Sequence, residues 1–237
     1  MKNSGLPTTI TRYFSNNTIE SLRKLREIIH QYPELSLQEY NTQSVLKQAL
    51  EQLEPHSIDT VAGTGLLATF KGTSSKAPIT VIRGDMDALP IHEQTGVSFS
   101  SKHHGVMHAC GHDVHATWAV GVGHLLRHHP VKGDVMILLQ PAEEMSEGAK
   151  RVLSSQALNR ADMIFGGHVD RRYAVPTVIC QQGAVSAASD RFDIMISGQS
   201  SHGARPEEGC DPTPQLAEAI RQIHNLPSLH KESQSQC

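Results

Sequence analysis

The chain has 237 residues, of which 38% are hydrophobic and 19% charged, as in an ordinary globular protein with one sizeable core. Its formal net charge of -3 gives no electrostatic reason to expect binding to nucleic acid or to an anionic membrane. No apolar run has the length of a signal peptide or a membrane span, and the four cysteines are widely spread. We therefore expect a cytoplasmic protein with free thiols.

The spacing of apolar residues predicts alternating helices and strands. Residues 19–29, behind Thr18, have helical spacing and predict an amphipathic helix that ends near Tyr32 and Pro33. A second helix is predicted over 38–53. Strands are then predicted over 66–70, 79–83, 135–140 and 163–165, with helices over 113–129 and 147–153. This alternation predicts an α/β fold with a largely parallel sheet.

The pattern of apolar and polar residues changes after about residue 182. Residues 191–197 alternate like a half-exposed strand and lead to a helix that begins after Pro214. One strand and one helix are too few to bury a core alone. We therefore expect a first domain over 1–185 and the beginning of a separate α+β unit over 186–237.

Polar motifs follow three of the predicted strands. Asp85 and Asp87 come after the second strand, Glu143 and Glu144 after the third, and His168 after the fourth. Open α/β sheets bind ligands outside the carboxyl ends of their strands. The sequence therefore predicts one functional site at this edge of the sheet.

Cys110 and His112 precede a predicted helix and can point the same way from an extended segment. Sulfur, nitrogen and carboxylate ligands together are typical of zinc-class metals. A buried cysteine beside a capping histidine would give the same pattern. A nucleophilic cysteine with His112 or His115 as its base is a third interpretation, but it leaves the two glutamates and His168 unexplained.

The acidic pairs also have two interpretations each. Glu143 and Glu144 could be a solvated helix N-terminus, or one could bind metal while the other moves a proton to and from water. Asp85 and Asp87 could be ordinary loop residues, or one could orient a ligating histidine. The sequence alone does not assign these roles.

Taken together, the motifs resemble the amidohydrolase branch of the M20 metallopeptidases, which includes auxin-amino-acid hydrolases, hippurate hydrolases and N-acetyldiaminopimelate deacetylases. The segments that carry the resemblance occur in order along the chain: RGDMDALPI (83–91), MHACGHD (107–113), QPAEE (140–144), GHVD (167–170) and SHGARP (201–206). The resemblance implies a di-metal hydrolase domain with the beginning of an inserted lid or dimerisation domain.

The resemblance also implies a role for each matching residue. The metal ligands for two divalent ions, zinc or manganese, would be Cys110, His112, Glu144 and His168. Glu143 would be the general base that activates water at the metals. Asp87, or alternatively Asp85, would support the site, and His202 of the lid would steady the oxyanion.

The implied reaction is hydrolysis of the amide bond of N-acyl amino acids or related small molecules, and the resemblance leaves open a homodimer through the lid. In this family the chain returns from the lid to the catalytic domain and supplies a last histidine ligand. No such segment follows in this sequence, so we expect a C-terminally truncated domain. The alternative function is an impaired remnant that binds metal or a partner chain without turnover.

Overall fold

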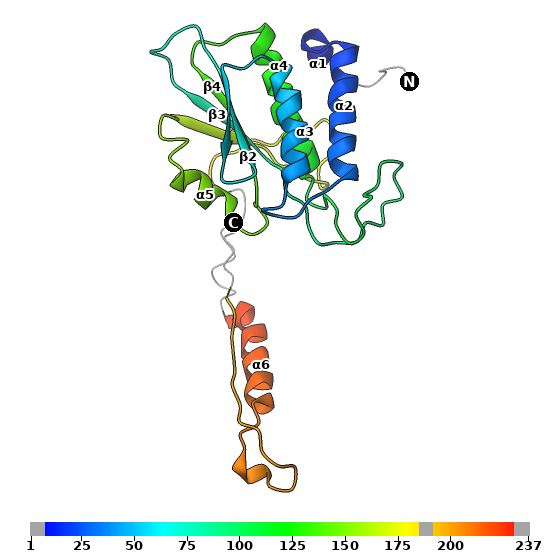
Figure 1. The fold of residues 1–237 in the computed structure, drawn as a ribbon, viewed down its shortest axis with the longest axis vertical. Coiled ribbons are helices and arrows are strands. Elements are labelled where there is room, and N and C mark those ends of the chain that lie inside the picture. Colours follow the sequence, from blue (N-terminus) through cyan, green and yellow to red (C-terminus); the bar gives the residue numbers. More distant parts are fainter. Residues whose placement is uncertain (1–7, 185–191, 230–237) are drawn as a thin grey trace. The chain divides into compact units, whose positions relative to one another are not determined.

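The computed structural model describes residues 8–184 and 192–229 of the chain. The chain divides into two compact units, Met1–Tyr173 and Ala174–Cys237, and each is described by itself. The first unit is an α/β domain, which confirms the predicted fold class (Figure 1).

The first unit is built around a five-stranded sheet in the order β1-β2-β4-β3-β5. The neighbouring strands β4, β3 and β5 are parallel, while β2 runs antiparallel to β4 and β1 antiparallel to β2. The strands are β1 (Ser57–Val61), β2 (Gly65–Phe70), β3 (Thr80–Asp85), β4 (Val135–Gln140) and β5 (Met163–Gly166). The parallel strands β3 and β4 are joined by a helical crossover, as parallel neighbours require.

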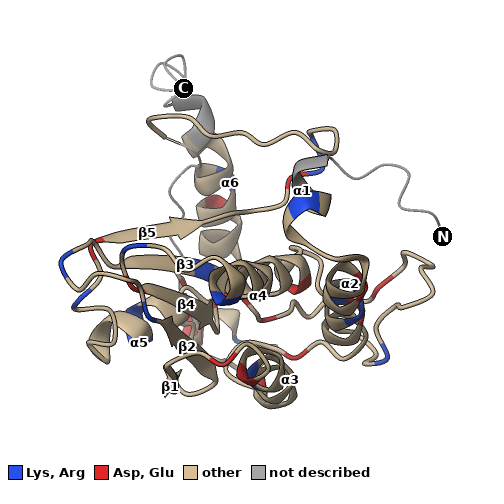
Figure 2. Ribbon diagram, turned by 90° about the horizontal axis from the view of Figure 1, so that it is seen from above, with Lys and Arg blue, Asp and Glu red and all other residues tan. Residues whose placement is uncertain are grey.

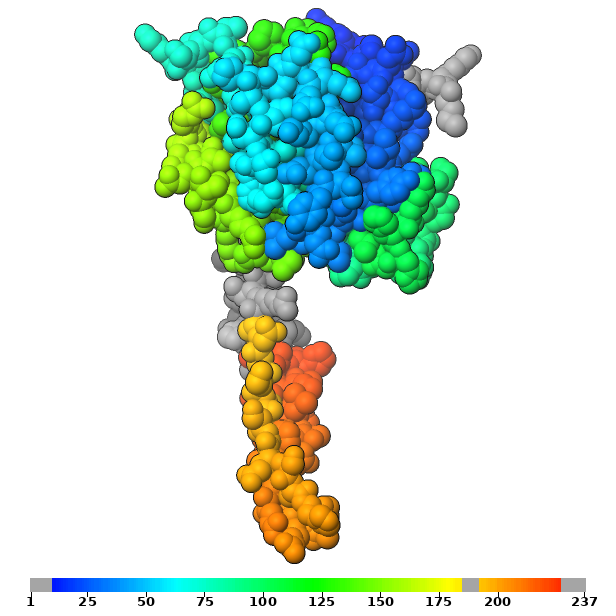
Figure 3. All heavy atoms as spheres, viewed as in Figure 1, coloured from blue at the N-terminus to red at the C-terminus, as the bar shows by residue number. Residues whose placement is uncertain are grey.

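Helices cover both faces of this sheet. The helices of the first unit are α1 (Thr8–Tyr13), α2 (Asn16–Gln31), α3 (Tyr40–Glu51), α4 (His112–His128) and α5 (Gly148–Ser154). α2, α3 and α4 pack together on one face (Figure 2), and α2 and α3 lie side by side on the outer surface (Figure 3). The other face is covered by α5 and the residues that follow it.

Alternate residues of the central strands supply the two cores. From β4, Ile137 and Leu139 join the core beneath α2, α3 and α4, while Met136 and Leu138 join the core beneath α5. All six residues of β4 are buried. A strand covered on both faces reads as a continuous apolar run, which is why its bounds were predicted correctly.

The helix ends differ from the predictions by a few residues. α2 begins earlier than expected, because the Ser15 hydroxyl accepts a hydrogen bond from the Thr18 amide and so caps the helix. α3 begins at Tyr40, and residue 38 lies outside it. α1 and β1 were not predicted, because both are short and their polar residues hide any helical or strand periodicity.

In the second unit, α6 (Thr213–Leu229) forms where a helix was predicted, although it begins one residue before Pro214. The predicted strand over 191–197 is wrong for residues 192–197, which form no ladder; residue 191 lies outside the described part. Only the isolated bridge between Gln199 and Cys210 pairs extended chain in the described part of this unit. None of the described helices is long and apolar enough to cross a membrane.

Candidate metal centre

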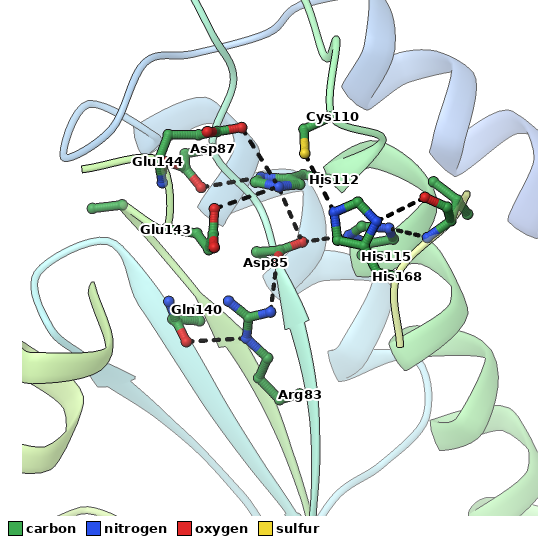
Figure 4. Close-up of polar contacts among 12 residues, drawn as sticks. Arg83, Asp85, Asp87, Cys110, His112, His115, Gln140, Glu143, Glu144 and His168 are labelled. Atoms are coloured by element: carbon green, nitrogen blue, oxygen red, sulfur yellow. Dashed lines mark hydrogen bonds and ion pairs between the residues drawn. The ribbon is translucent and has the colours of Figure 1, made fainter. Parts of the chain in front are cut away.

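Three strand ends bring the predicted site residues of the first unit together. Asp85 ends β3 and pairs in register with Gln140, the last residue of β4, so that the segment 141–144 leaves the sheet beside Asp85. His168 follows β5, and His112 opens α4. Figure 4 shows these side chains converging from separate elements on one point.

His112 lies at the centre of the cluster. Its Nδ1 donates to Oδ1 of Asp87 at 3.2 Å, so in the neutral imidazole Nε2 carries the lone pair. That Nε2 lies 3.7 Å from Oε1 of Glu144 and 3.9 Å from Oε2 of Glu143. His112 Nε2 and Glu144 Oε1 are both buried and have no hydrogen-bond partner among the described residues.

Cys110 and His168 face each other beside His112. The Cys110 Sγ lies 3.3 Å from Nε2 of His168, whose Nδ1 donates to the carbonyl oxygen of Val169 at 2.7 Å. The potential ligand atoms of Cys110, His112 and His168 lie within 4.8 Å of one another, and so do those of His112, Glu143 and Glu144. The atoms of Asp85, His112 and His115 form a third such group, so His112 belongs to all three. Because Nε2 of His112 has a single lone pair, it can bind one ion, and a second ion would depend on the other ligands.

The electrostatics of the cluster fit divalent cations. Burial raises the pKa of the Cys110 thiol to about 11, and the charges of Glu144 and Glu143 add to this effect. Burial also raises the pKa of Glu144, and Glu143 adds to the rise against the opposing effect of His112. A cluster of acids around a thiol lacks positive charge, which a bound cation would supply while deprotonating the thiol.

The same observation counts against a nucleophilic cysteine. Reactive thiols lie in electropositive surroundings that lower their pKa, whereas the surroundings of Cys110 raise it. His115, one of the two bases considered for that mechanism, is also fully engaged. Its Nδ1 donates to Oδ1 of Asp85 at 2.6 Å, and its Nε2 accepts the amide of Val169 at 2.9 Å.

The two aspartates of the 83–91 motif form hydrogen bonds with different histidines, although Oδ1 of Asp85 also lies 3.7 Å from Nε2 of His112. Asp87 binds His112 and accepts two further hydrogen bonds, from the Ser36 hydroxyl at 2.7 Å and the Glu144 amide at 3.1 Å. Burial opposes ionisation of Asp87, but the hydrogen bonds from His112 and Ser36 lower its pKa. Asp85 instead binds His115 and forms an ion pair with Arg83 at 2.6 Å.

A second buried network, which the sequence analysis missed, fixes the first turn of α4. Asp113 accepts hydrogen bonds from Nδ1 of His30 at 2.9 Å and from Nε of Arg26 at 2.8 Å, both on α2. Burial opposes ionisation of Asp113, while His30 lowers its pKa. The network holds α4, and with it His112, against α2. Its only sequence signal was the position of Asp113 within the 107–113 motif.

Ser36 and Glu39 were also missed. Both lie between α2 and α3, although Glu39 was expected inside the helix predicted over 38–53. Glu39 is fully buried, and its carboxylate accepts the Ala142 amide at 2.8 Å. The polar residue Ser36 gave no signal of its contact with Asp87.

His202 lies in the second unit, so its predicted action on the oxyanion stays a prediction. It is exposed, and its Nδ1 accepts the Ala204 amide at 3.2 Å. The turn that follows is closed by a hydrogen bond from the Arg205 amide to the His202 carbonyl oxygen.

Comparison with known proteins places this chain in a family. Residues 81–226 match the model of peptidase family M20/M25/M40. The chain is 40% identical over 190 residues to the N-acetyl-L-cysteine deacetylase of Bacillus subtilis, covering 79% of this chain and 45% of that protein. It is 38% identical over 217 residues to the N-acetyldiaminopimelate deacetylase of the same organism, covering 90% of this chain and 58% of that protein.

A solved structure gives the same result. The Bacillus subtilis protein YXEP, described as a dinuclear metal binding peptidase from the M20 family, is 41% identical with a TM-score of 0.61. The alignment covers 64% of this chain and 43% of that one. The chain thus spans about half the length of the curated relatives that it matches. With the family model matched over 81–226, the chain belongs to peptidase family M20/M25/M40.

Proposed function

We propose that this chain carries the metal-binding and proton-transferring side chains of an amidohydrolase that cleaves the amide bond of N-acyl amino acids. The observation that carries the proposal is the pair of unpartnered atoms, His112 Nε2 and Glu144 Oε1, that face each other at 3.7 Å. Two ligands of one ion at about 2 Å from it are separated by a distance of this order. The deacetylase names of the relatives support the substrate class.

The proposed ligands are Cys110, His112, Glu144 and His168, for two ions. Thiolate, imidazole and carboxylate together suit zinc, with manganese as the alternative. The ions, when bound, would supply Lewis-acid activation of the amide carbonyl and lower the pKa of a water molecule. Asp87 keeps the Nε2 of His112 free to bind, because it holds the proton on Nδ1.

Glu143 is the proposed general base. Its side chain is 42% exposed, and its Oε2 lies 3.9 Å from His112 Nε2, so it borders the ligand cluster and remains open to solvent. Its carboxylate takes a proton from the attacking water as the new C–O bond forms. It then delivers that proton to the departing amine nitrogen as the C–N bond breaks. Glu144, whose Oε1 is buried without a hydrogen-bond partner among the described residues, is the proposed metal ligand of the two.

The catalytic and lid roles would belong to two successive parts of the chain. Residues 1–185 would be the catalytic domain, and residues 186–237 would begin the lid or dimerisation domain, which carries His202, the proposed oxyanion-stabilising residue. Donors aimed at an oxyanion typically contribute about 3 kcal/mol each.

The test combines metal content with turnover. The purified chain is loaded with Zn²⁺ or Mn²⁺, its metal content per chain is measured, and hydrolysis of N-acetyl and N-benzoyl amino acids is followed. Glu143→Gln should keep the metal and lower kcat by about 10²- to 10⁴-fold, the usual contribution of a general base. Glu147→Gln, the same change four residues on, is the control and should keep both.

Three results would separate the alternatives. Metal binding with turnover that is lost in Glu143→Gln supports the amidohydrolase. Metal binding without turnover supports a remnant that only binds. A chain that binds neither metal in the wild type contradicts the proposed function.

A further inference from the structure

We infer that the buried carboxylate of Glu39 is a positioning residue that fixes the segment carrying Glu143 and Glu144. This inference rests on the proposed function of those two residues. Glu39 is 0% exposed, and its two oxygens bind different partners. Oε1 accepts the Ala142 amide at 2.8 Å, and Oε2 accepts the Thr64 hydroxyl at 2.5 Å.

Glu39 does not serve its own helix. It occupies the residue before the first turn of α3, where a side chain commonly caps the helix, yet it makes no such bond. The carboxylate of Glu34 takes that role instead, because it accepts the amides of Asn41 and Thr42 at 3.1 and 2.8 Å. The side chain of Glu39 is therefore free to reach Ala142, which follows the C-terminal end of the central strand β4.

Ala142 needs such a partner. Its φ of +48° lies in the left-handed region that residues with a Cβ rarely adopt, and it is completely buried. Its carbonyl oxygen accepts the Gly148 amide at 3.0 Å, so both of its backbone polar groups are bound. Conformations of this kind persist only where the surroundings hold them, and here Glu39 holds the amide.

Two carboxylates thus accept hydrogen bonds from the backbone of segment 142–144, one on each side of the proposed general base Glu143. Glu39 binds the amide of Ala142, and Asp87 binds the amide of Glu144. Glu143 lies between these two anchored amides, so the direction of its side chain follows from both. The short segment 34–39 carries Glu39 and also Ser36, whose hydroxyl donates to Asp87. This one segment therefore contacts both the Ala142 amide and the carboxylate that binds the Glu144 amide.

The buried carboxylate of Glu39 would destabilise the fold if it lost its two donors, the Thr64 hydroxyl and the Ala142 amide. A buried carboxylate is tolerated when hydrogen bonds satisfy it, and among the described residues Glu39 forms no ion pair. Replacement by glutamine preserves both contacts. The amide oxygen can accept from Ala142, and the amide nitrogen can donate to the Thr64 oxygen once that hydroxyl turns. Replacement by alanine removes both.

The experiment compares amide hydrogen exchange, resolved by residue, in the full chain and three variants without metal. In Glu39→Ala the amides of Ala142 and Glu144 should exchange at least about tenfold faster, while β4 and α4 keep their protection. Glu39→Gln should restore the wild-type rates. Glu51→Ala, an exposed acid at the far end of the same helix, should change neither amide.

Either of two results would overturn the inference: unchanged exchange at Ala142 and Glu144 in Glu39→Ala, or an even loss of protection that extends through β4 and α4. Zinc affinity, measured by competition with a chelator, gives a second readout. It should fall about 10- to 100-fold in Glu39→Ala and recover in Glu39→Gln, as for other residues that orient ligands. A wild type that binds no zinc would contradict the proposed function, while the exchange rates would still decide the role of Glu39.

Discussion

The Nε2 of His112 and the Oε1 of Glu144 face each other at 3.7 Å, and neither buried atom has a hydrogen-bond partner among the described residues. Asp87 produces this pairing from both sides, since it accepts Nδ1–H of His112 and the backbone amide of Glu144. Buried polar atoms without partners are rare and call for an explanation. A cation between the two atoms would satisfy both.

The first prediction follows from the three hydrogen bonds that Asp87 accepts. Asp87→Asn should weaken zinc binding by about 10- to 100-fold. An asparagine that keeps its oxygen on His112 turns its NH₂ toward the amide of Glu144, where two donors clash. The reversed amide would donate to His112 and move the ring proton to Nε2, which blocks the ligand atom.

Chelator competition measures that affinity, and Ser36→Ala is the control. It removes one of the three hydrogen bonds to Asp87 and leaves the contact with His112, so its effect should be smaller. Equal zinc affinity in wild type and Asp87→Asn would show that Asp87 does not set the state of His112.

The second prediction concerns Gly111, between Cys110 and His112. Its φ is +82°, and a Cβ at this position would lie 2.4 Å from Cγ2 of Val169. Gly111→Ala should therefore displace Val169 and its neighbour His168, and should lower metal affinity as well as stability. The left-handed backbone alone costs about 1–2 kcal/mol for a residue with a Cβ.

Gly96→Ala separates strain from collision. Gly96 has a similar φ of +69° but no atom within 4 Å of its ideal Cβ. Urea unfolding should show a loss of stability in both variants, whereas zinc titration should show weaker binding only in Gly111→Ala. If the two variants bind zinc equally well, a Cβ at position 111 that collides with Val169 does not disturb the proposed metal ligands Cys110 and His168.

The elements that sequence analysis predicted well are those whose pattern is set by burial. The run 135–140 is β4 to the residue, because a strand covered on both faces is apolar throughout. The strand expected over 191–197 had alternating residues but, among those described, no neighbouring strand to pair with. Alternation indicates a surface that could pair, and pairing itself depends on residues far along the chain.

The site residues also differ in how far the sequence could predict them. Cys110, His112, Glu144 and His168 stood out in the sequence as candidates, but their assignment as ligands came only from the resemblance to the M20 family and stays a prediction. The choice between Asp85 and Asp87 could not be made, since both lie at the end of the same strand and only the fold shows that they form hydrogen bonds with different histidines. Glu39 reaches Ala142 across 103 positions, a contact that no local pattern encodes.

The third prediction separates the two histidines of α4. His115→Ala should destabilise the protein without metal by roughly 1–3 kcal/mol, because Asp85 and the amide of Val169 lose a buried partner. His112→Ala should abolish zinc binding, since it removes the ligand common to all three candidate groups. Urea unfolding of the metal-free proteins and zinc titration under native conditions measure the two effects. Loss of zinc binding in His115→Ala to the extent seen in His112→Ala would contradict the assignment of His115 to structure.

The last prediction concerns pH and a residue far from the site. Asp134, just before β4, accepts hydrogen bonds from Lys71 at 2.8 Å and from the Gly72 amide at 3.0 Å, and these lower its pKa. A carboxyl group with a lowered pKa stabilises the folded state above its ordinary pKa, and this contribution is lost as the pH falls through the lowered value.

Asp134→Asn should therefore be less stable than wild type near neutral pH, and the difference should shrink as the pH falls below about 4. Unfolding free energies from urea titrations at several pH values measure that difference. Glu51→Gln, at an exposed acid of α3, should show no comparable trend. A difference between wild type and Asp134→Asn that stays constant down to about pH 2 would mean that the carboxylate charge does not tie β2 to β4, because the aspartate would then act only through its shape and neutral hydrogen bonds.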